Sequence, residues 1–330
     1  MQPRWVVSAR KAIQGSDAAG RADGSSGFFE WAGRGRRTMI VESEIVTRCI
    51  LCNGTRLRPL ALTLRPGLPH FCRVRCRDCG LVISSPMASQ ETLNRYYADY
   101  FTTGCHADQT CGETYERRLR AGQRAVREIQ EYVRAGRFLD VGCGAGHVCK
   151  AAEDSGFESH GVDLSESGIE FAKRHFGLKR VACGQLADVG FAAGMFDVVH
   201  CWHLLEHVRD PVALIGEIRR ILVPGGYLYW GTDNHRSSGY TLLRLFSFLT
   251  MRFPPIYDGI EHTYGFNPAT IGRLLEAHGF RSLSVRTYPD PFRAGEILRD
   301  ARETGIGKAV RTFAQSVFRI KMRGVAQRKA

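Results

Sequence analysis

The sequence predicts an α/β protein with a doubly wound mixed sheet, preceded by a small metal-binding module. Apolar segments typical of buried strands alternate with amphipathic helical segments over residues 136–290. A glycine-rich turn follows the first of these strands, and two C-x-x-C pairs lie upstream of it. A chain of 330 residues with 44% hydrophobic residues can hold one catalytic domain of ordinary size and a small appended module.

The two C-x-x-C pairs indicate a zinc site. Two such knuckles can supply four thiolates to one tetrahedral ion, which leaves no coordination position open for chemistry. We therefore expect a structural Zn²⁺ that folds a small module; the alternative is two reduced or disulfide-forming pairs. The predicted ligands are Cys49, Cys52, Cys76 and Cys79.

The first strand-helix-strand unit of the domain spans residues 137–163. Phe138, Leu139 and Val141 suit a buried parallel strand, and the glycines that follow let a turn approach a ligand without side-chain obstruction. A helical segment then ends near Gly156. Asp163 ends the next strand, where a carboxylate can accept hydrogen bonds from ribose hydroxyls.

The glycine spacing distinguishes between nucleotide ligands. A dinucleotide fingerprint needs G-x-G-x-x-G, but His147 stands at the third glycine position and the chain reads G-x-G-x-G. The turn therefore suits an adenosine-bearing ligand without phosphates. The segment Asp140–Gly146 resembles the first motif of the class I methyltransferases that use S-adenosylmethionine, an acid followed by x-G-x-G-x-G, and Asp163 matches their second motif.

Later segments continue this alternation. Residues 196–201 form a buried strand, Asp210 and Pro211 open a helix, and the turn at 224–226 leads into a fifth strand. Asn267 and Pro268 open the last helix, which a last strand follows. The segments LLEHVRDP, PGGYL, HTYGF and LLEAHGF resemble bacterial small-molecule methyltransferases, including the ubiquinone-pathway O-methyltransferase type. The stretch from Cys76 to Tyr97 resembles the zinc-ribbon leader of some methyltransferases, including deoxysugar C-methyltransferases, in which the leader helps to form the substrate pocket.

The resemblance implies a set of cofactor-binding residues. The glycine loop would contact the methionine part of S-adenosylmethionine, Asp163 the ribose, and three further residues the adenine. The set is Asp140, Gly142, Cys143, Gly144, Gly146, Asp163, Leu164, Gln185 and Leu186. If the acceptor is a hydroxyl or an acidic carbon, a base must take its proton. The candidates are His203, His207 beside Glu206, and His262 near Tyr264; for each of them a packing role is the alternative.

We expect five segments along the chain. They are a disordered basic tail (1–38), a zinc-ribbon-like module (39–90), a helical linker or lid (91–135), the methyltransferase domain (136–290) with a substrate-covering insertion (234–259), and a basic C-terminal extension (291–330). In that extension a helix would gather apolar residues among bases and contact an anionic membrane or an acidic partner, or else cover the sheet. Its apolar residues are Val310, Phe313, Val317 and Ile320, and its bases are Lys308, Arg311, Arg319, Lys321 and Arg323.

The charge distribution disfavours nucleic acid as a partner. The net charge is +13, but residues 1–38 carry seven bases against three acids, and residues 304–330 carry seven against none. The rest therefore holds 46−14=32 bases and 33−3=30 acids, a net charge of only +2, so most of the basic excess lies outside the body that would form a nucleic-acid groove. No apolar run is long enough to span a membrane, and the first residues lack the apolar core of a secretory signal, so we expect a cytoplasmic protein.

The favoured function is methyl transfer from S-adenosylmethionine to oxygen or carbon of a small molecule of the sugar, quinone or secondary-metabolite type. The main alternative is an RNA-base methyltransferase whose zinc module grips nucleic acid. Against it, HCWHLLEH follows the fourth strand where base amino-group methylation needs an N-P-P-Y type of loop. A nicotinamide oxidoreductase lacks support because the glycine spacing is wrong and no Tyr-x-x-x-Lys pair occurs. A non-catalytic zinc-bearing binding module is the remaining alternative.

Overall fold

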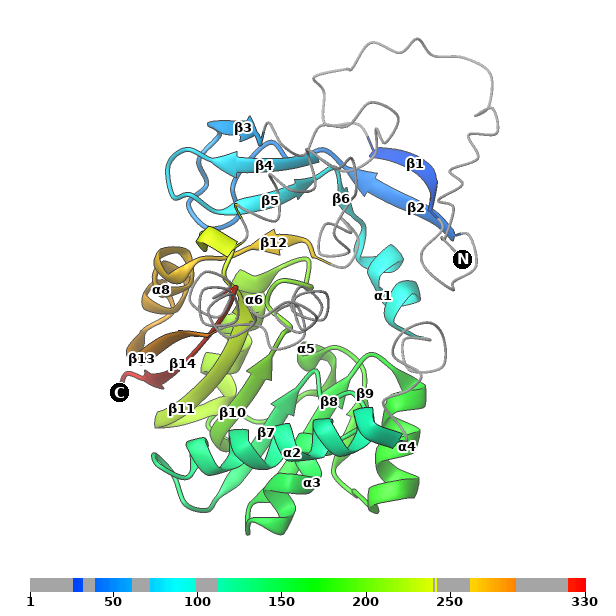
Figure 1. Cartoon of the computed structure of the whole chain (residues 1–330), viewed down its shortest axis with the longest axis vertical. Helices are drawn as coiled ribbons and strands as arrows, with labels where there is room; N and C mark the ends of the chain where they lie inside the picture. The colour runs from blue at the N-terminus through cyan, green and yellow to red at the C-terminus, as the bar shows by residue number, and fades with distance from the viewer. Residues whose placement is uncertain are drawn as a thin grey trace, which may run out of the picture.

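The computed structural model describes residues 26–31, 39–60, 72–98, 112–239, 241, 262–288 and 320–330. These residues form a seven-stranded sheet with helices on both faces, and two smaller sheets at the carboxyl side of its central strands (Figure 1). The predicted insertion at 234–259 lies mostly outside the described residues, as does the stretch 289–319 of the C-terminal extension.

The large sheet has the strand order β13-β14-β11-β10-β7-β8-β9. The five strands from β11 to the edge strand β9 run parallel, and β14 is antiparallel to both β11 and β13, which makes the sheet mixed as predicted. The strands are β7 (Arg137–Val141), β8 (Glu158–Asp163), β9 (Val181–Cys183), β10 (Phe196–Trp202), β11 (Leu222–Asp233), β13 (Phe280–Tyr288) and β14 (Lys321–Arg328).

Helices cover both faces of this sheet. Alternate residues of β7 point to opposite sides: Phe138 packs with α2 and α3, whereas Leu139 belongs to the core that includes α6 and α8. The helices are α2 (Gly112–Ile129), α3 (His147–Asp154), α4 (Glu166–Phe176), α5 (Leu186–Val189), α6 (Pro211–Ile221) and α8 (Pro268–Ala277). Within the described ranges, no helix combines the length and the apolar character that a membrane crossing needs.

The predicted helix starts are confirmed by their caps. The Asp210 carboxylate accepts a hydrogen bond from the Ala213 amide at 2.8 Å at the start of α6. Asn267 and Thr270 bond to each other's backbone amides in a capping box at the start of α8. These caps set the first residue of α6 and of α8. They therefore set where the loops after β10 and β12 end, and these loops form the site.

The N-terminal module is joined to the catalytic domain through a shared sheet. Its strands β3 (Leu57–Pro59), β4 (Cys72–Cys76) and β5 (Val82–Ser85) are extended by β12 (Tyr264–Gly265), which comes from the catalytic domain. A second sheet contains β1 (Ser26–Trp31), β2 (Met39–Glu44) and β6 (Met87–Ala88), and α1 (Gln90–Ala98) follows it.

The prediction of disorder over residues 1–38 is wrong for Ser26–Trp31. This segment, SGFFEW, forms β1 and pairs antiparallel with β2 along its whole length. Phenylalanine and tryptophan favour strands, and the tail's content of glycine, serine and arginine concealed this short aromatic stretch. Residues 1–25 and 32–38 lie outside the described residues.

The predicted C-terminal helix is wrong where it enters the described residues. Residues 321–328 form β14 inside the sheet, between β11 and β13, so the catalytic domain does not end at residue 290. Ile320, Met322 and Ala326 are buried and lie two and four residues apart, as the strand period requires for one face. The neighbouring bases contact acids of this chain: Lys321 pairs with Asp233, and Arg323 with Glu128. Residues 308–319 lie outside the described residues.

A substitution at Gly324 can test whether β14 lies between β11 and β13. A Cβ atom at this position would overlap the carbonyl oxygen of Ser284 and lie 2.7 Å from the Trp230 ring. We expect Gly324→Ala to lower the free energy of unfolding by about 1–3 kcal/mol. Gly272→Ala is the matched control, because open space surrounds that helical position and alanine there should stabilise by about 0.5–1 kcal/mol. Urea unfolding measures both, and a Gly324→Ala midpoint equal to that of the original chain would contradict the placement of β14.

Candidate active site

The glycine loop lies at the carboxyl end of β7. Gly142, Gly144 and Gly146 all adopt positive φ, at 79°, 54° and 80°, which explains why glycine stands at each of them. The amides of Gly142 and Cys143 donate to the Val162 carbonyl of β8 at 2.8 and 3.1 Å. The loop is thereby held against the neighbouring strand, with the end of β8 beside it.

Two members of the predicted cofactor set, Gly146 and Cys143, have their side-chain positions inside the protein. A Cβ on Gly146 would lie 2.7 Å from the Cβ of Ala172, so this glycine allows α3 and α4 to approach each other closely. The Cys143 side chain is buried, and its sulfur lies with that of Cys149 beside Gly161 beneath the loop. Any contact of Cys143 or Gly146 with a ligand therefore comes from the backbone.

Asp163 joins the loop to the end of β8. One oxygen of its carboxylate accepts from the Gly144 amide at 2.7 Å and the other from the Ser165 amide at 2.8 Å. Burial of the carboxylate raises the pKa of Asp163 to about 6, although the two amide hydrogen bonds oppose this shift. The side chain is thus held in one orientation at the edge of the sheet.

The residues predicted to lie beside adenine come from two adjacent strand ends. Asp163 pairs with Cys183 across β8 and β9, and the Cys183 thiol lies 3.6 Å from the Leu164 carbonyl. Gln185 then caps α5, and Leu186 is buried. The structure therefore brings Leu164 and Gln185 to the same edge of the sheet as the glycine loop.

Asp140 occupies a different environment. It is buried within the sheet, and its carboxylate bonds Nδ1 of His200 on β10 at 2.6 Å. His200 stacks with Trp202 and Tyr229, at ring distances of 5.9 and 5.7 Å. The partner of Asp140 could not be recognised from sequence, because a histidine inside a strand gives no signal of its own.

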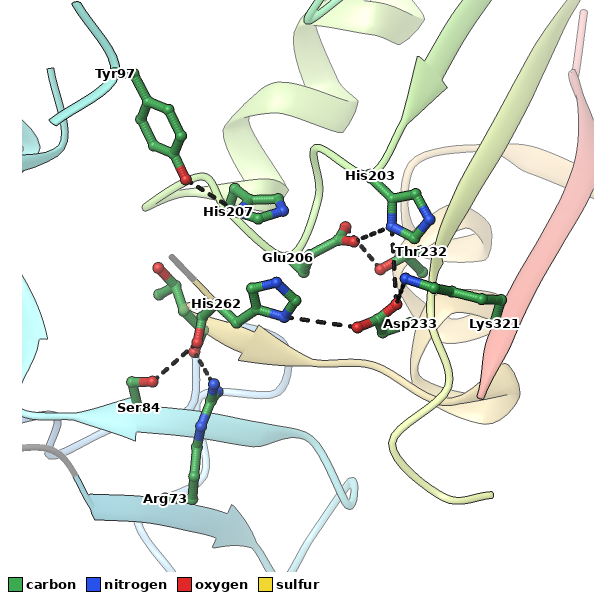
Figure 2. Close-up of polar contacts among 11 residues, drawn as sticks. Arg73, Ser84, Tyr97, His203, Glu206, His207, Thr232, Asp233, His262 and Lys321 are labelled. Atoms are coloured by element: carbon green, nitrogen blue, oxygen red, sulfur yellow. Dashed lines mark hydrogen bonds and ion pairs between the residues drawn. The ribbon is translucent and has the colours of Figure 1, made fainter. Parts of the chain in front are cut away.

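A histidine-carboxylate pair lies next to the glycine loop. His203 follows β10 with φ of 50°, and its Nδ1 lies 2.6 Å from Oε1 of the buried Glu206 (Figure 2). Thr232 donates to the other Glu206 oxygen at 2.8 Å. The neighbouring Leu204 would lie 3.4 Å from a Cβ on Gly142, which places this connection beside the loop.

The Glu206 carboxylate determines which ring nitrogen of His203 donates a hydrogen bond. Burial by itself would raise the pKa of Glu206, but His203 lowers it to about 2. An ionised carboxylate only accepts hydrogen bonds, so the Nδ1–H of His203 is the donor in this bond, and Nε2 is the ring nitrogen left to contact an acceptor. The His203 side chain is 27% exposed, whereas Glu206 is 0% exposed, so only the histidine can meet an acceptor.

Asp233 connects this pair to a second histidine. Asp233 ends β11; its Oδ1 lies 2.6 Å from Nζ of Lys321 and 3.8 Å from Nδ1 of His203, and its Oδ2 lies 3.6 Å from Nδ1 of His262 (Figure 2). Burial opposes ionisation of Asp233, but Lys321 and the two histidines keep its pKa well below the usual range. Burial also lowers the pKa of His262 well below its usual value, and Asp233 opposes this shift.

His207 contacts α1. Its Nδ1 lies 3.0 Å from the Tyr97 hydroxyl, and its ring meets that of His262 edge-on, with centroids 4.7 Å apart. The structure thus gathers all three predicted bases, with His203 bonded to a buried carboxylate and His207 to a tyrosine. Sequence reasoning missed Asp233 and placed Lys321 in a peripheral helix.

The N-terminal module holds the segment that carries His262. Ser84 of β5 donates from its hydroxyl to the His262 carbonyl at 3.0 Å and from its amide to the Thr263 carbonyl at 2.9 Å. The buried Arg73 of β4 donates to the same Thr263 carbonyl at 3.4 Å. The position of His262 therefore depends on the packing of the module.

The four predicted cysteine ligands converge in this module. The sulfurs of Cys49 and Cys79 are 3.5 Å apart and those of Cys52 and Cys76 3.6 Å apart, and all four lie within 4.8 Å of one another. None forms a disulfide. A tetrahedral zinc ion with sulfur ligands at about 2.3 Å needs sulfurs separated by roughly 3.8 Å, which this cluster provides with little movement.

Comparisons with known proteins decide the family. A family described as "Methyltransferase domain" matches residues 114–285, just over half of the chain. The chain belongs to this family. Together with the glycine loop and its acid, the match confirms the prediction of a class I S-adenosylmethionine-dependent methyltransferase of the small-molecule type.

Individual relatives agree with this result. A ubiquinone biosynthesis O-methyltransferase of Thiobacillus denitrificans is 36% identical over 161 residues, which cover 46% of this chain and 68% of the relative. One from Coxiella burnetii is 35% identical over 164 residues, covering 48% and 69%. A solved structure from Pyrococcus horikoshii matches 70% of this methyltransferase and 99% of its own chain with a TM-score of 0.50; at 18% identity this likeness shows the fold alone.

Proposed function

We propose that this methyltransferase transfers the methyl group of S-adenosylmethionine to a hydroxyl oxygen of a small ring-bearing molecule, with His203 as the general base. The observation that carries the proposal is the His203–Glu206 pair at 2.6 Å beside the glycine loop. The relatives named above are O-methyltransferases of ubiquinone biosynthesis, which supports a phenol-like acceptor.

The cofactor would bind along the carboxyl ends of β7, β8 and β9. Backbone groups of Gly142–Gly146 would hold the methionine part, the Asp163 carboxylate the ribose, and Leu164 with Gln185 the adenine. When bound, S-adenosylmethionine supplies an electrophilic methyl group on a sulfonium. The chain then has to orient the acceptor oxygen in line with that methyl group and exclude water, since this positioning provides most of the acceleration.

The residues near β10 and β11 would handle the proton. Nε2 of His203 would accept the hydroxyl proton while its Nδ1–H stays bonded to Glu206, which stabilises the resulting imidazolium. Thr232 holds Glu206 in place, because the second carboxylate oxygen accepts from the Thr232 hydroxyl. His262 would line the acceptor side of the site.

The four-cysteine cluster would hold one structural zinc ion. Its geometry fits tetrahedral sulfur coordination, and four thiolates leave no position for a substrate. The ion would stabilise β4 and β5, and through them the His262 segment. Zinc would thus support the acceptor site without entering the chemistry.

The proposed function is tested by following the methyl group. The protein is incubated with S-adenosylmethionine carrying a labelled methyl and a set of phenolic small molecules or a nuclease-treated cell extract. We expect label in a low-molecular-mass fraction as a base-stable methyl ether. Label that disappears on nuclease treatment, or that enters only nitrogen or carbon positions, would contradict the proposal.

Cofactor affinity should depend on the ionisation of Asp163. Its pKa is raised to about 6, and only the carboxylate can accept bonds from both ribose hydroxyls. Affinity should therefore be full above that pH and fall, by at most about tenfold per pH unit, as the pH drops below about 6. Asp163→Asn should bind S-adenosylmethionine at least about tenfold more weakly and without this dependence. Calorimetric titrations across this range provide the measurement, and equal affinities on both sides of pH 6 would refute the assigned role.

A further inference from the structure

A second group of metal-ligand side chains lies apart from the four cysteines. Asp233 ends β11, His235 lies just after it, and His262 precedes β12; each offers one donor atom, and these atoms all lie within 4.8 Å of one another. The two segments are fastened together by the backbone, because the His235 amide donates to the Phe266 carbonyl at 2.8 Å. Three donors from two tethered segments therefore converge beside the site described above.

The orientation of His262 points to a missing partner. Its Nδ1 is buried and has no hydrogen-bond partner among the described residues, an arrangement that costs stability unless another group satisfies it. The atom lies 3.6 Å from Oδ2 of Asp233, too far for a hydrogen bond. Two ligands at about 2.0–2.2 Å from one ion are separated by roughly 3–3.5 Å, which is close to this spacing. The other carboxylate oxygen of Asp233, Oδ1, accepts a hydrogen bond from Nζ of Lys321.

A neighbouring combination is less suited to an ion. His203, Glu206 and Asp233 also lie within 4.8 Å of one another. In that set, however, His203 Nδ1 and Glu206 Oε1 bond each other at 2.6 Å, and Thr232 occupies the second Glu206 oxygen. The ligand atoms of His203 and Glu206 are thus already hydrogen-bonded. Among the described residues, Nδ1 of His262 forms no such bond.

We propose that Asp233, His235 and His262 bind a divalent transition-metal ion of the Mn²⁺, Fe²⁺, Co²⁺ or Zn²⁺ class. Two imidazole nitrogens and one carboxylate oxygen suit these ions and leave coordination positions open. An open position near His203 would take the acceptor's oxygen and lower the pKa of its hydroxyl; this role rests on the proposed function, whereas metal binding itself does not. Because Lys321 partly neutralises Asp233, the ion should be held less tightly than one bound by four thiolates.

Mn²⁺ is the suitable probe, because it prefers oxygen and nitrogen ligands over the thiolates of the cysteine cluster. The full-length, zinc-loaded protein is dialysed against a mild chelator and then titrated with Mn²⁺, and the free ion is followed by electron paramagnetic resonance. Neither S-adenosylmethionine nor acceptor is present. We expect one Mn²⁺ bound per chain, with the zinc content of the protein unchanged.

Two ligand variants and one control complete the test. His235→Asn and His262→Gln should each weaken Mn²⁺ binding at least about tenfold while leaving zinc content and S-adenosylmethionine affinity unchanged. His278→Gln, at the end of α8, should bind Mn²⁺ like the original chain. Absence of Mn²⁺ binding, or unchanged binding by both ligand variants, would overturn the proposal. A chain that binds Mn²⁺ through these residues but methylates no hydroxyl would support the metal site and refute the proposed function.

Discussion

His203→Ala should reduce methyl transfer to an acceptor hydroxyl by about 10²- to 10⁴-fold, the range that a positioned general base provides. The affinity for S-adenosylmethionine should stay within about twofold, because the predicted cofactor contacts come from β7, β8 and β9. The loss should appear in kcat, since the proton is transferred in the chemical step. Single-turnover assays with labelled cofactor measure the step directly, and calorimetry measures cofactor binding.

Glu206→Gln separates a base from a packing residue. Glutamine fills the same volume but can no longer stabilise an imidazolium on His203, so the pH at which activity rises should move downward while cofactor affinity is kept. His207→Gln is the matched control, because its Nδ1 contacts Tyr97 and no carboxylate. Its rate should change far less than that of His203→Ala. Equal losses in the two histidine variants, or an unshifted pH profile in Glu206→Gln, would assign His203 a structural role.

Local signals account for what could be predicted of the fold. The positive φ of Gly142, Gly144 and Gly146 and the caps formed by Asp210 and Asn267 depend on residues within a few positions of each other, so sequence carries them directly. The place of β14 depends instead on β11 and β13, which are distant in the chain. A strand of mixed apolar and basic residues cannot be recognised without the strands beside it. The helix predicted for the C-terminal extension therefore ran into Lys321 and Arg323, which lie in β14.

The candidate site shows the same division. His203, His207 and His262 were recognisable because histidine is the usual base near neutral pH, and the structure gathers them. Asp233 and Lys321 gave no signal, since their pairing exists only once β14 lies against β11. Ser84 and Arg73 donate hydrogen bonds to backbone carbonyls of the His262 segment. Every residue has such a carbonyl, so these bonds leave no pattern in the sequence. Tertiary partners of this kind require the folded chain.

Cys79→Ser should remove one zinc per chain and greatly reduce methyl transfer while leaving S-adenosylmethionine binding intact. A structural zinc site contributes about 10–16 kcal/mol to the folding of small modules, more than a small module gains from its own core. Without the ion, β4 and β5 should loosen, and with them the bonds from Ser84 and Arg73 to the His262 segment. Within the described part of the chain, the glycine loop makes no hydrogen bond to the module, so cofactor binding should persist.

The measurements for this variant are zinc content by mass spectrometry, cofactor affinity by calorimetry and methyl transfer with labelled cofactor. Cys183→Ser is the matched control, because Cys183 is an exposed cysteine outside the cluster and serine can still donate to the Leu164 carbonyl. Its zinc content should equal that of the original chain. Ser84→Ala tests the connection separately: it should keep its zinc and its cofactor affinity, yet raise KM for the acceptor, because His262 loses one of its anchors. A Cys79→Ser protein with full methyl transfer would show that the module and the acceptor site are independent.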